Sequence, residues 1–213
     1  MVVTDEELGS RAGVEILKRG GNAVDAAVGT AFALAVVEPA AGNIGGGGFM
    51  LIRLSDGKTT FLDYRETAPG KATRDIYIGK DGKLDEEASV VGYRSVAVPG
   101  TVAGLELALK TYGTMKLADV MAPAIRLAEE GFAVSEKLAG ELEEESPGLQ
   151  AFPASKRIFL RGGEHFKAGE RFRQPELAAT LKRIADNGAT EFYRGETAQW
   201  LAAEMAKNGG IIS

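Results

Sequence analysis

The chain has 213 residues and no cysteine, and its 25 basic and 30 acidic side chains give a net charge of −5. The lack of cysteine excludes disulfides, thiolate metal sites and cysteine nucleophiles, and the acidic balance argues against non-specific binding to nucleic acid or to an anionic membrane. The start of the sequence has no basic segment followed by an apolar run, so it shows no signal peptide. The most apolar stretch, residues 31–37, is too short for a membrane span.

Two helices are predicted near the N-terminus. The first begins near Thr4, which can form a capping box with Glu7 three residues later, and it ends at a pair of glycines. Asn22 caps the second helix, residues 23–37, and Asp25 favours its first turn. This second helix is apolar on all sides, which is typical of a buried helix.

A β-hairpin is predicted after the glycine run at residues 45–48. Residues 49–54 and 59–64 are strand-like, and the sequence SDGK between them is a turn signal. The glycine run indicates a close approach of another backbone or a ligand, and tight packing is the simpler explanation.

Arg65 stands where the second strand should end. An arginine at a strand end can present a planar fork of donors to a carboxylate. A structural salt bridge to Asp63 or Glu66 would explain the same residue, so the pattern alone leaves both interpretations open.

The rest of the chain is predicted to be mainly helical, over residues 101–111, 117–130, 135–144, 175–186 and 196–207. Residues 96–98 suggest a short strand, and residues 158–163 a small hairpin or loop. We predict one partial domain over residues 1–213, with a helix pair plus hairpin in residues 1–100 and mainly helices in residues 101–213. Strands are too few for this number of helices, which indicates an α+β fold whose sheet is incomplete here.

Other site patterns fail on inspection. A dinucleotide fingerprint starting at Gly45 would need a glycine at Met50, and a P-loop ending at residues 57–59 would need one at Ile52. His165 is the only histidine and lies in a polar, loop-like segment, so we expect an exposed loop residue rather than a metal ligand. The sequence therefore predicts no metal and no cofactor.

Several segments, in this order and spacing, resemble the γ-glutamyltransferase (glutathione hydrolase) family, specifically the N-terminal part of its large subunit. They are residues 20–28 (GGNAVDAAV), 36–39 (VVEP), 45–51 (GGGGFML), 62–69 (LDYRETAP), 98–104 (VPGTVAG), 112–115 (YGTM), 130–132 (EGF) and 208–212 (NGGII). Such a series is far more specific than any one motif and covers nearly the whole chain. Asn43 departs from the pattern, where the family usually has a small residue.

The resemblance implies an N-terminal-nucleophile hydrolase fold, an αββα sandwich of which only part is present here. In that family a precursor cleaves itself, and the new N-terminal threonine of the small subunit attacks γ-glutamyl amide bonds. The γ-glutamyl group then passes to water or to an amino acid. The implied partners are γ-glutamyl substrates such as glutathione and that small subunit.

Arg65 matches the family arginine that grips the α-carboxylate of the substrate, so the resemblance favours a substrate-binding role for it. No catalytic residue of the family falls within residues 1–213, and we expect the isolated chain to be inactive. Family members are often periplasmic or secreted, although this sequence shows no signal peptide. Acylases and capsule transpeptidases of the same fold remain alternatives, as does a non-catalytic truncated fragment.

Overall fold

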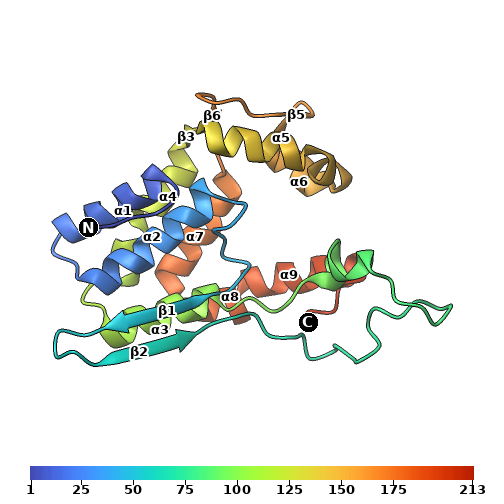
Figure 1. The fold of residues 1–213 in the computed structure, drawn as a ribbon, viewed down its shortest axis with the longest axis horizontal. Coiled ribbons are helices and arrows are strands. Elements are labelled where there is room, and N and C mark those ends of the chain that lie inside the picture. Colours follow the sequence, from blue (N-terminus) through green and yellow to red (C-terminus); the bar gives the residue numbers. More distant parts are fainter. The chain divides into compact units, whose positions relative to one another are not determined.

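The computed structural model describes all residues, 1–213, and the chain forms two compact units (Figure 1). The first unit contains Met1–Asn43 and Gly113–Ala185, and the second contains Ile44–Tyr112 and Asp186–Ser213. Each unit therefore combines two separate stretches of the sequence. That the chain forms a single partial domain stays a prediction.

The first unit is built around helix α2 (Ala23–Val37), which packs against α1 (Glu7–Lys18) and α4 (Leu117–Glu130). Most of α2 is buried, as its uniformly apolar sequence predicts. Gly29 allows the close approach, since a methyl group there would lie 2.7 Å from the carbonyl oxygen of Val120.

Short paired strands and three further helices complete the first unit. These elements are β3 (Phe132–Ala133), α5 (Glu136–Ala151), α6 (Pro153–Phe159), β4 (Leu160–Arg161), β5 (Glu164–His165), β6 (Arg171–Phe172) and α7 (Pro175–Asn187). Strand β3 pairs with β6, and β4 pairs with β5, both antiparallel. A small hairpin or loop was expected at residues 158–163, and the β4–β5 hairpin confirms it in part, because residues 158–159 belong to α6. The β3–β6 pair was not predicted.

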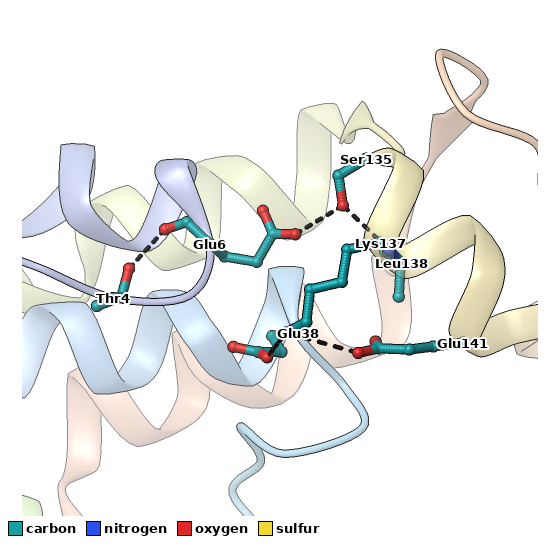
Figure 2. A network of polar contacts seen from close by, with 7 residues as sticks. All are labelled: Thr4, Glu6, Glu38, Ser135, Lys137, Leu138 and Glu141. Atoms are coloured by element: carbon teal, nitrogen blue, oxygen red, sulfur yellow. Dashed lines mark hydrogen bonds and ion pairs between the residues drawn. The ribbon is translucent and has the colours of Figure 1, made fainter.

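A polar network ties the start of α5 to the ends of α1 and α2 (Figure 2). Ser135 caps α5 by accepting a hydrogen bond from the Leu138 N–H, and its hydroxyl donates to the buried carboxylate of Glu6 at 2.6 Å. The ammonium group of Lys137 pairs with Glu38, which is also buried.

The prediction that Thr4 caps α1 is wrong. The helix begins after Glu6, and no side chain caps it. The hydroxyl of Thr4 instead donates to the carbonyl oxygen of Glu6 and contacts Ser10, so its hydrogen-bonding capacity is used locally. Asn22 is a true cap, since it forms a complete capping box with Asp25 at the start of α2.

The second unit consists of a β-hairpin with three helices. Strands β1 (Phe49–Arg53) and β2 (Thr59–Asp63) pair antiparallel, with Leu51 opposite Phe61. Helix α3 (Thr101–Tyr112) contacts β2 and also α8 (Ala189–Arg194), which packs against α9 (Glu196–Lys207). Two 3₁₀ turns, η1 (Glu87–Ser89) and η2 (Tyr93–Ser95), interrupt the long connection before α3.

The two faces of the hairpin differ in exposure. Phe49, Leu51 and Phe61 on the outer face are 57%, 74% and 57% exposed, and the two phenylalanine rings stack 5.5 Å apart. Ile52, on the inner face, is buried. The outer face is thus an unpartnered apolar surface within this chain.

Most predicted element boundaries agree with the structure to within a residue, and three differences stand out. The strand expected at residues 96–98 is only a single bridge, between Thr67 and Val98. Helix α5 runs past Pro147 to Ala151 instead of ending near residue 144, and neither α6 nor α8 was predicted. No helix combines the length and the apolar character that crossing a membrane requires.

Candidate functional site

The glycine run and the start of α3 hold the end of β2 between them. The carbonyl oxygen of Gly46 accepts hydrogen bonds from the N–H groups of Gly100 and Thr101, at 2.8 and 3.0 Å. Gly48 exchanges two backbone hydrogen bonds with Tyr64, at 3.0 and 3.3 Å. The predicted close approach at the glycine run is therefore an approach of backbone to backbone.

Glycine is required here because side chains would collide with the strand end. A methyl group at Gly47 would lie 2.5 Å from the carbonyl oxygen of Tyr64, and one at Gly100 would overlap the same atom. A methyl group at Gly104 would overlap the Cβ and Cγ atoms of Tyr64. We call Gly47, Gly100 and Gly104 the glycine clamp.

Backbone hydrogen bonds fix both sides of Arg65. Tyr64 before it pairs with Gly48, and Thr67 after it exchanges two hydrogen bonds with Val98, at 3.1 and 2.9 Å. The N–H of Arg65 itself donates to the carboxylate of Asp63 at 2.9 Å. The backbone that carries this side chain is consequently held more firmly than a free loop would be.

The guanidinium group of Arg65 is accessible and only partly engaged. Its side chain is 57% exposed, and Nε lies 3.2 Å from a carboxylate oxygen of Glu66. Cζ lies 5.9 Å from the centre of the Phe49 ring. Neither terminal nitrogen, Nη1 or Nη2, donates a hydrogen bond within the chain, so both remain available as donors. The sequence allowed two interpretations of Arg65, a structural salt bridge or a binding site for a carboxylate. The structure contains the salt bridge to Glu66, and the terminal nitrogens are still available to bind a carboxylate.

Tyr64 is the residue of this region that sequence reasoning missed. It is half-buried, and burial raises the pKa of its phenol above the ordinary value. Its hydroxyl donates to the carbonyl oxygen of Phe49 at 3.4 Å. The available signal was the pair of glycines at positions 100 and 104, about one helical turn apart, the first just before α3 and the second within it.

His165 lies in the short strand β5, paired with Leu160, rather than in the loop expected for it. It is partly buried. No group of three or more histidine, cysteine, aspartate or glutamate side chains is arranged to hold a metal ion. Gly57 and Lys58 lie in the hairpin turn, where Lys58 pairs with Asp56 at 3.0 Å, and a strand rather than a helix follows.

Comparisons with known proteins agree with the series of motifs. The family model described as Gamma-glutamyltranspeptidase matches residues 9–213. The glutathione hydrolase proenzyme of Escherichia coli (strain K12) is 49% identical over 216 residues, which cover 100% of this chain and 37% of the relative. The Acylase ACY 1 proenzyme of Pseudomonas sp. (strain V22) is 44% identical over 218 residues, covering 100% of this chain and 39% of the relative.

The solved structure of Helicobacter pylori gamma-glutamyltranspeptidase superposes with a TM-score of 0.98 at 46% identity, covering 100% of this chain and 61% of that one. The fold is thus part of an N-terminal-nucleophile hydrolase fold, as expected. The chain spans 37% of the length of its E. coli relative. The chain belongs to the γ-glutamyltranspeptidase family.

Proposed function

We propose that these residues form the substrate-holding part of an enzyme that cleaves γ-glutamyl amide bonds and transfers the γ-glutamyl group to water or to amino acids. Family membership supports the reaction class, and glutathione, named in relatives such as the E. coli glutathione hydrolase proenzyme, is the natural candidate substrate. The observation that carries the proposal for this chain is Arg65, whose terminal nitrogens are unpaired on a backbone held on both sides.

In this proposal Arg65 binds the α-carboxylate of the γ-glutamyl group through Nη1 and Nη2. A bidentate, charge-assisted pair fixes both position and orientation. Holding the far end of the substrate in this way reduces the freedom of the scissile amide at the other end, which favours attack by a positioned nucleophile. The ion pair between Nε and Glu66, at 3.2 Å, does not involve the terminal nitrogens.

The nucleophile would come from sequence outside these 213 residues, namely the N-terminal threonine of a small subunit. The exposed outer face of the hairpin, with Phe49, Leu51 and Phe61, supports this division because a surface of this kind is normally covered by further structure. The isolated chain is therefore expected to be inactive on a γ-glutamyl anilide. Robust turnover by residues 1–213 alone would contradict this part of the proposal.

Arg65→Ala in the full-length protein tests the binding role. Loss of two charge-assisted hydrogen bonds should raise KM for a γ-glutamyl anilide by about 100-fold or more, with Arg65→Lys in between because an ammonium cannot replace the planar fork. Arg53→Ala is the matched control, since Arg53 is exposed at the far end of the same hairpin. An unchanged KM in Arg65→Ala would overturn the carboxylate role.

The 44% identity to the Acylase ACY 1 proenzyme makes an acylase the alternative function. A panel of three acyl donors distinguishes the two functions. The γ-glutamyl donor has a carboxylate and an amine at its far end, the glutaryl donor only the carboxylate, and the 4-aminobutyryl donor only the amine. Arg65→Ala should impair the first two and leave the third unchanged. A wild-type preference for the glutaryl donor would favour the acylase, and failure of the full-length protein to turn over any donor would favour a non-catalytic role.

A further inference from the structure

We propose that Tyr64 is a positioning residue for substrate binding: seated against α3, it fixes the register and direction in which Arg65 leaves the strand. The proposal rests on the carboxylate-binding role proposed for Arg65. It concerns a residue that would touch no substrate and would act only through its neighbour.

We call the space that the side chain of Tyr64 fills its seat, and Gly104 and Gly48 both lie close to it. Gly104 on α3 lies directly under Cβ and Cγ, where even a methyl group would overlap them. On the other side, a methyl group at Gly48 would lie 3.0 Å from the ring atom Cε2. The side chain therefore fills a space that depends on glycine at position 104 and that any side chain at position 48 would narrow.

The backbone of Tyr64 is as constrained as its ring. Its carbonyl oxygen lies against Gly47 and Gly100, two members of the glycine clamp, and it accepts the hydrogen bond from Gly48. These close contacts and hydrogen bonds oppose both a shift of Tyr64 along the strand and a rotation of its peptide group. Contacts of the side chain and of the carbonyl group thus both restrict the position of Tyr64.

The fixed position of Tyr64 determines on which face Arg65 lies, because successive side chains of a strand point to opposite faces. Tyr64 occupies the inner face beside α3, and Arg65 is close to Phe49 on the outer face. The side chain of Arg65 is 57% exposed, and its other contacts are one ion pair at 3.2 Å and the Phe49 ring at 5.9 Å. A slip of one residue would turn Arg65 inward.

A double-mutant cycle in the full-length protein tests the coupling. Tyr64→Ala empties the seat and should lower kcat/KM for a γ-glutamyl anilide about tenfold, mainly through KM, since small misplacements of a binding group are costly. In an Arg65→Ala background the same substitution should have almost no further effect. Tyr64→Phe keeps the ring and loses only the hydroxyl contact at 3.4 Å, so it should retain the wild-type KM.

Tyr112→Ala is the matched control. Tyr112 also joins α3 to the hairpin, with its hydroxyl 3.4 Å from that of Thr60, but toward the opposite end of the strand. Loss of support for the hairpin in general would raise KM in both variants, whereas positioning of Arg65 predicts the rise only for Tyr64→Ala. Tyr64→Leu, which keeps an apolar side chain in the seat, provides a milder variant should Tyr64→Ala fail to fold, and its KM should rise in the same direction.

The outcomes separate the two proposals. An unchanged KM in Arg65→Ala overturns the binding role, and the positioning role with it. A raised KM in Arg65→Ala, combined with wild-type values for Tyr64→Ala or Tyr64→Leu, overturns the positioning role alone. Effects of Tyr64 and Arg65 that multiply in the double variant also overturn it, because Tyr64 would then act independently of Arg65.

Discussion

The carboxylate of Asp25 joins two distant motifs of the first unit, because it accepts hydrogen bonds from both the backbone N–H and the hydroxyl of Thr114, at 2.9 and 2.6 Å. It also accepts from the N–H groups of Met115 and Asn22, at 3.0 and 2.7 Å. Asp25 is fully buried. One side chain thus closes the capping box of α2 and fixes the segment that leads into α4.

Asp25→Asn should destabilise the full-length protein by about 3 kcal/mol, because an amide NH₂ would face N–H donors that now bind a carboxylate. The measurement is chemical denaturation followed by circular dichroism. Asp119→Asn is the control: Asp119 pairs with Arg19 at 3.0 Å on the surface, where the two side chains are 47% and 39% exposed. That substitution should cost less than about 1 kcal/mol, and an equal cost for both variants would contradict the argument.

The same site predicts a pH dependence. Burial opposes the charged form of Asp25, but the hydrogen bonds from Thr114, Asn22 and Met115 outweigh it and hold the pKa below its ordinary value. A lowered folded-state pKa adds stability that is fully present above the unfolded-state pKa of about 4 and is lost as the pH falls through the folded-state pKa.

The difference in Tm between wild type and Asp25→Asn should therefore be constant from neutral pH down to about pH 5 and shrink below about pH 4. Thermal melts across this range measure it. A difference that persists unchanged down to about pH 3, or that grows on acidification, would show that the carboxylate charge is not what stabilises the site.

Local signals in the sequence predicted the parts of the fold that depend on local chemistry. Asn22 followed by Asp25 defined the start of α2, and the turn at residues 55–58 defined the hairpin. The prediction that Thr4 caps α1 was wrong, because a capping sequence shows only which groups could form a hydrogen bond. In the structure the hydroxyl of Thr4 contacts Glu6 and Ser10 instead. Helix α5 continues beyond its expected end although Pro147 lies within it.

The motif in the sequence predicts Arg65 as a binding residue, and that role stays a prediction. The surroundings of Tyr64 could not be predicted, because they depend on Gly104, which is 40 positions further along the chain. A glycine in a helix indicates that something comes close, but only the tertiary structure shows what does. The two-residue strands β3 and β6 escaped prediction for the same reason, since their pairing joins Phe132 to Phe172.

Two glycine-to-alanine substitutions within helices should have opposite effects on stability. Alanine favours a helix over glycine by up to about 1 kcal/mol. A methyl group at Gly140 of α5 meets nothing within 4 Å, so Gly140→Ala should raise Tm. At Gly104 the methyl group would overlap Tyr64, so Gly104→Ala should cost about 1 to 3 kcal/mol despite the same gain in propensity. Thermal unfolding of the two full-length variants measures their Tm values. A higher Tm for Gly104→Ala than for the wild type would contradict the close contact between Gly104 and Tyr64.

Two lysines that form ion pairs in the first unit should also respond differently to replacement by methionine. Lys137 pairs with Glu38, whose side chain is only 9% exposed, whereas Lys182 pairs at 2.5 Å with Glu129, which is 56% exposed (Figure 2 shows the first pair). The two lysine side chains are similarly exposed, at 42% and 46%. Lys137 also lies 3.5 Å from Glu141, which is 30% exposed, so the main difference between the pairs is the buried carboxylate of Glu38 that Lys137→Met would leave behind.

Lys137→Met should lower Tm by several degrees, because the carboxylate of Glu38 would stay nearly buried without its cation. Lys182→Met should leave Tm almost unchanged, because water can solvate Glu129 fully. Adding Glu38→Gln to Lys137→Met removes the unpaired charge and should recover much of the lost stability, while Glu129→Gln has nothing to recover. Differential scanning calorimetry at neutral pH measures all four variants. If Lys137→Met melts with the wild type, the network at the start of α5 contributes no net stability.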